Sequence, residues 1–374
     1  MRFIINTVNL DIGGAHQRAV SFLNELRSIG RPDDEYHIFI TSKITAQVDI
    51  TSFKSNFSFY NFFYSPASLR HHWSIVRLFN RIEKKINPNV VFSFVGPAYW
   101  RPRGTHLVGF GIPHLVYTEY GYVKKLPLKT KFEMAYKKWW TIREADFYVV
   151  QTEDVKKRIF QNLGVADEKI FVVSNGIGSQ YKEVVPKRNL NLPPRLLIIS
   201  RYRAQKNYEV IVPTIVRLKS MGYRVEFHLT IEDEVYNKLF KGLEDWVINH
   251  GPVKAAECPG LYNECDALFL PSHLECFSAS YPEAMKMKRP IITSNLSFAK
   301  TVCGDAALYI DNIDPDDVAN KIILLFQKQS LYDDLVRKGT ERLSKFLNST
   351  QQAEAYLDLM HKLSFIASAP EEGI

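Results

Sequence analysis

Two glutamates, Glu275 and Glu283, are separated by the seven residues Cys-Phe-Ser-Ala-Ser-Tyr-Pro. An apolar run at 267–271 precedes them and predicts a buried strand, and a helix is expected to begin around Pro282. The backbone N–H groups of residues 278–281, at the start of that helix, would form a site for an anion. Two carboxylates beside such a site can accept hydrogen bonds from vicinal sugar hydroxyls. The combination suits a nucleotide-sugar, although a glutamate pair at this spacing also arises by chance on surface helices.

A pair of cations follows a second apolar strand, predicted at 195–199. Arg201 and Lys206 lie five residues apart on the loop after that strand. Fixed cations in a dry site stabilise the negative charge that develops on a departing diphosphate. The alternative is an ordinary solvated loop. Because both cations are expected on a loop, we expect their replacement to change folding little.

In type and order these two segments resemble the signature of the family 4 retaining glycosyltransferases. The family's loop usually reads Glu-Gly-Phe-Gly before the second glutamate, and Cys276 and Ser278 replace both glycines here. Ser200 likewise stands where the family has a glycine before the arginine. The segment 171–176, Phe-Val-Val-Ser-Asn-Gly, resembles the strand and turn that end the family's crossing between domains.

The resemblance implies a role for each candidate residue. Glu283 would hold the ribose hydroxyls, Glu275 would contact the donor sugar, and Arg201 and Lys206 would neutralise the diphosphate. The other donor contacts that it implies are Gly13, Gly14, Phe277, Ser278, Ala279 and Ser280. It implies no cofactor beyond the nucleoside-diphosphate sugar as co-substrate, and the sequence has no paired-aspartate motif for a metal.

The amino-terminal segment predicts the opening unit of a Rossmann-type domain. A strand at 2–8 is followed by Gly13-Gly14 and by a helical pattern at 15–29. A dinucleotide fingerprint would need a third glycine and a later acidic residue, so a nicotinamide enzyme is not expected. The resemblance further implies a histidine that faces the donor sugar, and His114 is the best candidate for this catalytic role. The competing histidines are His71, His72 and His106.

The order of the elements predicts an α/β fold with two domains. Apolar strands at 90–94, 147–150, 196–199 and 290–293 alternate with helical patterns in a chain of 374 residues. The resemblance implies two facing Rossmann-like domains of the GT-B type, each with a mostly parallel sheet. We expect an acceptor-binding domain at 1–178 and a nucleotide-sugar-binding domain at 179–348, with a linker at 176–194. A terminal helix at 349–374, capped by Ser349 or Thr350, is expected to pack back on the first domain.

The positive charge of the chain gathers in its first half. Residues 1–178 hold 24 Lys and Arg against 15 Asp and Glu, whereas residues 179–374 hold 24 against 25. The densest stretch runs from Lys124 to Arg143 and includes Trp139 and Trp140. Basic and aromatic residues together favour peripheral contact with an anionic membrane. The alternative is a solvated lysine face with both tryptophans buried beneath it.

Further patterns limit the class of protein. No apolar run approaches the length of a membrane-spanning helix or a signal peptide, and no nucleic-acid-binding motif accompanies the basic stretch. The four cysteines lack metal-ligand spacing and are expected to be free thiols in a reducing cytoplasm.

Taken with these features, the resemblance implies a metal-independent, retaining transferase in the cytoplasm or on the inner face of the cytoplasmic membrane. It would move a hexose from a UDP- or GDP-sugar to a glycan acceptor, carried on a membrane lipid, as in the synthesis of bacterial surface polysaccharide and lipopolysaccharide. Two alternatives stay open: a sugar-nucleotide epimerase of the same fold, and a catalytically silent nucleotide-sugar-binding protein.

Overall fold

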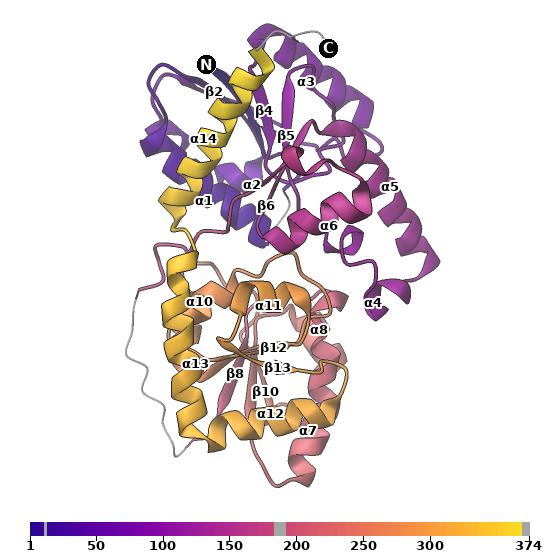
Figure 1. Cartoon of the computed structure of the whole chain (residues 1–374), viewed down its shortest axis with the longest axis vertical. Helices are drawn as coiled ribbons and strands as arrows, with labels where there is room; N and C mark the ends of the chain where they lie inside the picture. The colour runs from indigo at the N-terminus through magenta and orange to yellow at the C-terminus, as the bar shows by residue number, and fades with distance from the viewer. Residues whose placement is uncertain (11–12, 183–191, 369–374) are drawn as a thin grey trace. The chain divides into compact units, whose positions relative to one another are not determined.

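The computed structural model describes residues 1–10, 13–182 and 192–368, which fall into two units (Figure 1). Unit 1 comprises Met1–Gly176 and Asn348–Ile374, and unit 2 comprises Ile177–Leu347. From the sequence, this boundary is expected between residues 178 and 179. Residues 183–191 of the expected linker at 176–194 lie outside the described residues.

Unit 1 is built on a parallel sheet of seven strands within the described residues, in the order β3-β2-β1-β4-β5-β6-β7. Its strands are β1 (Arg2–Asn6), β2 (Glu35–Ile40), β3 (Phe57–Asn61), β4 (Val90–Ser93), β5 (Thr105–Gly109), β6 (Phe147–Val150) and β7 (Ile170–Val172). Its α-helices are α1 (Gly14–Ile29), α2 (Ser42–Thr45), α3 (His72–Ile86), α4 (Gly121–Lys124), α5 (Leu128–Glu144), α6 (Glu153–Leu163) and α14 (Ser349–Ser368).

Unit 2 has a parallel sheet of six strands within the described residues, in the order β10-β9-β8-β11-β12-β13. Its strands are β8 (Arg195–Ile198), β9 (Glu226–Leu229), β10 (Val247–Asn249), β11 (Ala267–Leu270), β12 (Ile291–Ser294) and β13 (Ala307–Ile310). Its α-helices are α7 (Ile211–Ser220), α8 (Asp233–Phe240), α9 (Cys258–Glu264), α10 (Ser280–Lys286), α11 (Ser297–Cys303), α12 (Pro315–Gln327) and α13 (Gln329–Arg342).

The apolar runs in the sequence became the central strands of both sheets. Every residue of β4, β11 and β12 is buried, as expected for strands that are covered on both faces. The core of unit 2 packs Phe227 of β9 against Phe269 of β11, with ring centroids 5.5 Å apart. The predicted α/β fold with two parallel-sheet domains is therefore confirmed.

The terminal helix α14 lies against α1 within unit 1 (Figure 1). Its amino-terminal cap differs from the expected Ser349 or Thr350. The side chain of Asn348 accepts a hydrogen bond from the backbone N–H of Gln351 at 2.8 Å, and the Gln351 side chain accepts one from the Asn348 N–H at 2.9 Å. This reciprocal arrangement satisfies two N–H groups at the helix start. Thr350 instead donates to Glu25 of α1 at 2.8 Å.

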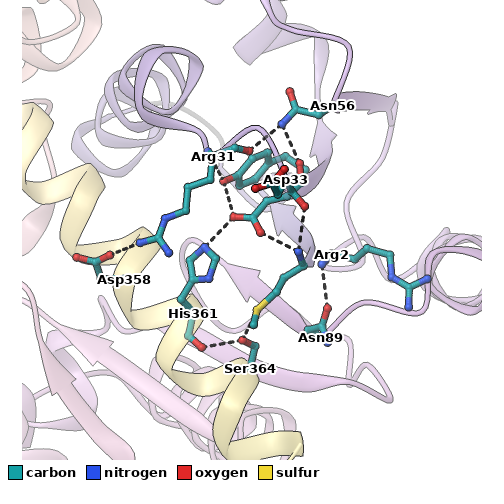
Figure 2. A network of polar contacts seen from close by, with 11 residues as sticks. Arg2, Arg31, Asp33, Asn56, Asn89, Asp358, His361 and Ser364 are labelled. Carbon is teal, nitrogen blue, oxygen red and sulfur yellow. Dashed lines mark hydrogen bonds and ion pairs between the residues drawn. The ribbon is translucent and has the colours of Figure 1, made fainter.

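Polar contacts fix α14 to the start of β1, as Figure 2 shows. The terminal amine of Met1 donates to Asp34 at 2.7 Å, and the His361 ring lies 2.7 Å from the other oxygen of that carboxylate. Nearby, Arg31 pairs with Asp358 of α14 at 2.7 Å (Figure 2). Asp34 is buried and faces two nitrogen groups, so this cluster ties the second half of α14 to the segment that leads into β2.

Candidate functional site

The loop after β11 carries Glu275 and is fixed by two asparagines. The Asn312 side chain donates to the backbone oxygens of Pro271 and Ser272 at 3.0 and 3.1 Å, and Asn207 donates to that of Pro271 at 3.2 Å. Asn207 is buried and has a left-handed backbone, with φ of 56°, which asparagine tolerates better than most residues. These bonds hold the loop at the carboxyl edge of the sheet, where ligands bind in open α/β folds.

The two loops predicted to bind the donor meet at Lys206 and Glu275. The ammonium of Lys206 donates to Glu275 Oε1, and the hydroxyl of Ser272 donates to the same oxygen at 3.1 Å. The side chains of Lys206 and Glu275 are only 13% and 12% exposed. A backbone bond from His273 to Gln205, at 2.8 Å, joins the loops beside this pair. Because the charge of Lys206 is largely buried against Glu275, we expect its replacement to cost stability, unlike the replacement of a residue on a solvated loop.

Arg201 lies in a different environment. Its side chain is 41% exposed, and its guanidinium is 3.9 Å from the carboxylate of Glu232. Ser200, which stands for the family's glycine, exchanges a hydrogen bond with the hydroxyl of Tyr208 at 3.0 Å. Arg201 thus keeps an exposed charge after β8, whereas Lys206 is already paired.

The segment between the two glutamates leads into α10. Phe277 packs edge to face on Phe346 with ring centroids 6.2 Å apart, Ser278 is buried, and Ser280 donates to the backbone oxygen of Ile199 at 3.4 Å. The helix starts at Ser280. Ala279 occupies the N-cap position, and its side chain has no group that could accept a hydrogen bond from the helix. Pro282 is consequently the third helical residue, two positions later than its expected place at the helix start.

Glu283 stands in the first turn of α10 and accepts hydrogen bonds from two tyrosines. The hydroxyl of Tyr262, on α9, lies 3.2 Å from Glu283 Oε2, and that of Tyr181 also bonds the carboxylate. Burial raises the pKa of Glu283 to about 7, while the two hydroxyls act in the opposite direction. Neither tyrosine was predicted from the sequence, because no motif or spacing marks them. Ser272 could have been found from its place directly after a buried strand.

The remaining predicted residues belong to unit 1. Gly13 has a φ of 120°, a conformation that strongly favours glycine, and Gly14 begins α1. His114 lies in a short helical turn after β5, and burial, with a smaller contribution from nearby Lys137, lowers its pKa. This lowered pKa favours the neutral imidazole form of His114 at neutral pH.

The competing histidines have local partners. His106 is fully buried between the Ser93 hydroxyl and the Glu144 backbone oxygen, at 2.8 and 2.6 Å, and burial lowers its pKa to about 4. His71 stacks on Tyr64, with ring centroids 3.7 Å apart. The His72 ring bonds the Pro66 backbone oxygen at 2.8 Å. These contacts hold each of the three rings against neighbouring residues of unit 1.

The described residues hold neither a cluster of metal ligands nor a membrane-spanning helix. Within residues 1–10, 13–182 and 192–368, no three His, Cys, Asp or Glu side chains gather in a way that could hold a metal ion. No helix in the same part of the chain combines the length and apolar character needed to cross a bilayer.

Two family models match the chain, one on each side of the boundary between the units. The model described as "Glycosyltransferase Family 4" matches residues 12–180, and the model described as "Glycosyl transferases group 1" matches residues 193–328. A curated relative, O-antigen chain mannosyltransferase B of Escherichia coli, is 29% identical over 184 residues, which are 46% of this chain and 48% of that protein. The matches to curated relatives span between 35 and 48% of those proteins' own length.

Solved structures match nearly the whole chain. Sucrose-phosphate synthase of Thermosynechococcus elongatus superposes with a TM-score of 0.76 at 14% identity, covering 99% of this chain and 100% of the other. The Anabaena protein HepE, in complex with UDP and glucose, gives a TM-score of 0.73 at 14% identity, covering 96% and 99%. At such low identity these likenesses establish a common fold of the GT-B type.

Proposed function

The chain belongs to the family 4 glycosyltransferases, and on that premise we propose that it transfers a hexose from a UDP- or GDP-sugar to a glycan acceptor with retention of configuration. The observation that carries the proposal is the contact between Lys206 and Glu275 beside the start of α10. It places a cation, a carboxylate and a helix start at one edge of the sheet in unit 2. A sugar diphosphate presents the complementary groups, namely two phosphates and a set of hydroxyls.

In the proposed complex, unit 2 binds the donor. The diphosphate lies against Arg201, Lys206 and the N–H groups of residues 277–280, where fixed positive charge stabilises the leaving group. Glu283 accepts hydrogen bonds from the ribose hydroxyls, and Glu275 contacts the hydroxyls of the donor sugar. Glu275 can serve this role because Lys206 and Ser272 both bond Oε1, and within the described residues no hydrogen bond occupies Oε2.

The same contacts favour front-face substitution over a covalent intermediate. A carboxylate that accepts from an ammonium and a hydroxyl is a weakened nucleophile, so Glu275 is poorly suited to attack the anomeric carbon. In the proposed step the acceptor oxygen bonds to the anomeric carbon while the bond to the β-phosphate oxygen breaks. The acceptor proton passes to the departing phosphate, and the new bond forms on the face that the leaving group vacates. No metal or further cofactor takes part in this proposal.

Unit 1 would receive the acceptor, and its catalytic histidine would be His114. The neutral state of His114 suits a hydrogen bond to a sugar hydroxyl, because an imidazole can both donate and accept. Gly13 and Gly14 let a ligand approach the start of α1 closely, since a Cβ at either position would meet no atom within 4 Å. The name of the E. coli relative supports an acceptor of the surface-polysaccharide type.

An exposed aromatic stripe on unit 1 supports an acceptor that is carried by a membrane lipid. Leu128, Phe132, Tyr136 and Trp139 recur along one side of α5 and are 73, 74, 48 and 48% exposed. Trp73 of α3 is also 71% exposed. The sequence-based alternative of two buried tryptophans is thus wrong for Trp139.

Basic residues flank the stripe. Lys124, Lys125, Lys129 and Lys131 are all exposed, so cations lie next to large apolar side chains, as in proteins that bind anionic bilayers from one side. We therefore place the protein, as part of this proposal, on the inner face of the cytoplasmic membrane during transfer.

A two-step experiment tests the proposed function. Thermal unfolding is first followed with UDP, GDP, ADP and CMP; a nucleotide at about 100 times its dissociation constant adds about 2.7 kcal/mol of stability. Sugar transfer to lipid-linked glycans is then measured with the matching sugar nucleotide, and the anomeric configuration of the product is read by NMR. Stabilisation by neither UDP nor GDP would refute the donor assignment. Conversion of the donor sugar without an acceptor would instead identify an epimerase, and binding with no turnover a silent binding protein.

A further inference from the structure

The carboxylate of Glu283 is held from two directions. The Tyr262 hydroxyl, on α9, lies 3.2 Å from the carboxylate and has the Ser280 backbone oxygen as a second acceptor at 3.3 Å. Tyr181 reaches the carboxylate from residues 177–182, the described segment that begins unit 2. The two rings pack edge to face with centroids 5.9 Å apart, and both side chains are buried. The rings therefore fix each other, and each hydroxyl is fixed relative to the carboxylate.

This arrangement determines how Glu283 can bind a diol. An ionised carboxylate offers about four acceptor positions on its two oxygens. Two are taken by the tyrosine hydroxyls, so about two are left for a pair of vicinal hydroxyls. A protonated carboxyl would have to direct its own hydrogen to one of these partners. Only the ionised form can accept from both tyrosines and from both hydroxyls of a ribose at once.

The groups around Glu283 make its ionisation sensitive to the two hydroxyls. Those that act on it come from α9, which supplies Tyr262 and Cys258, and from Tyr181. Burial raises the pKa of Cys258 to about 11 and the pKa values of both tyrosines above their usual value, so all three are neutral at physiological pH. Burial of Glu283 favours its protonated form, and the hydrogen bonds from Tyr181 and Tyr262 favour the ionised form.

We propose that Tyr181 and Tyr262 are positioning residues that keep Glu283 in its ionised, diol-binding state, so that nucleotide binding is coupled to loss of a proton from Glu283. This inference rests on the proposed function, in which Glu283 binds the ribose. It adds a dependence on pH that the choice of a glutamate alone would not create, since an exposed glutamate is ionised throughout the range from pH 6 to 9.

The coupling predicts a definite pH profile. If only the ionised form binds, the apparent dissociation constant equals the intrinsic one divided by the ionised fraction. With a midpoint of about 7, affinity should be about ten-fold lower at pH 6 than on its plateau above pH 8. Replacement of either tyrosine by Phe removes a hydrogen bond to the charged form. The midpoint should then move upward by about one unit, and the plateau affinity should return at high pH.

The experiment measures ionisation and binding separately. Infrared difference spectra of the nucleotide-free protein against Glu283→Gln give the ionisation midpoint of Glu283 in the wild type, Tyr181→Phe and Tyr262→Phe. Calorimetric titration with UDP and with GDP from pH 6 to 9 gives the midpoint for binding. The control is Tyr236→Phe on α8. This substitution removes a tyrosine hydroxyl that donates to the Val247 backbone oxygen at 2.8 Å and not to Glu283. Ionisation of the nucleotide's own phosphate affects all variants equally. The readout is therefore the difference in midpoint pH between each variant and the wild type.

We expect both midpoints to rise together in the two variants and to stay unchanged in the control. An infrared midpoint that neither variant moves would overturn the positioning role. A displaced infrared midpoint with the same binding profile in all variants would overturn the coupling to nucleotide. If neither UDP nor GDP binds at any pH although the infrared midpoint moves, the proposed function fails, and the coupling to nucleotide fails with it.

Discussion

Replacement of Lys206 by Met should lower both stability and turnover, because the ammonium of Lys206 pairs with Glu275 and, in the proposed function, neutralises the diphosphate. The pair with Glu275 is nearly buried, at 13% and 12% exposure. Breaking a fully buried pair costs about 3–5 kcal/mol, and an exposed pair contributes about 0–1 kcal/mol. We therefore expect a loss of about 2–3 kcal/mol, tempered by the hydroxyl of Ser272, which still bonds the orphaned carboxylate. For a domain of the size of unit 2 (Ile177–Leu347), that loss of stability lowers the melting temperature by roughly 4–12 °C.

The assay combines thermal unfolding with initial rates of sugar transfer. Lys206→Met with Glu275→Gln removes both charges and should restore most of the melting temperature, while transfer stays at least about 100-fold below wild type. Arg201→Ala is the matched control: it removes a cation from the same loop that is 41% exposed and 3.9 Å from its carboxylate. It should reduce transfer to a similar degree and change stability by no more than about 0.5 kcal/mol.

Either of two results would refute this reasoning. A Lys206→Met protein that melts with the wild type would show that the ion pair does not stabilise the loops. A double variant that is less stable than Lys206→Met would show that the loss did not come from an uncompensated charge on Glu275. Separately, full transfer activity in Arg201→Ala would show that Arg201 does not bind the diphosphate.

Two further predictions concern the donor and the membrane. Glu283→Ala should weaken calorimetric binding of UDP or GDP, whereas Glu275→Ala should leave nucleotide binding nearly intact and depress transfer; an equal loss of affinity in both would contradict the separate roles. Charge reversal at Lys129 and Lys131, which are exposed on α5, should release the protein from anionic vesicles at low salt, since each cation near such a surface contributes about 1 kcal/mol. Lys138 is less suitable because it donates to the Asn162 backbone oxygen at 3.0 Å. Unchanged co-sedimentation would leave the stripe without a membrane role.

Local sequence patterns were sufficient for the strands and for the start of α1, which was expected at residue 15 and lies at Gly14. The apolar run at 267–271 corresponds to β11, and that at 90–94 to β4, because a short, continuously apolar run is typical of a strand that is covered on both faces. The cap of α14 was misassigned, because Asn348, Ser349 and Thr350 are all good capping residues and only backbone geometry selects among them.

The candidate site was predictable in part. The family resemblance drew attention to Lys206 and Glu275, but not to their mutual contact, since the two residues are 69 positions apart. Tyr181 and Tyr262 were missed, because a tyrosine that bonds a carboxylate has no distinguishing neighbours in sequence. The exposure of Trp139 was also undecided, since a helix with basic residues on several sides does not indicate which side faces its own core.

The sequence by itself thus determined the class of fold, the alternation of strands and helices, and the residue types available for binding a phosphorylated sugar. These depend on local hydrophobic periodicity and on short motifs. The tertiary structure decided which charges remain available. Parallel pairing of β8 with β11 brings the carboxyl ends of the two strands to one edge, and the loops that follow then pair Lys206 with Glu275 while Arg201 stays exposed. Burial, a property of the packed chain alone, raises the pKa of Glu283 toward neutrality and gives the hydroxyls of Tyr181 and Tyr262 their influence over it.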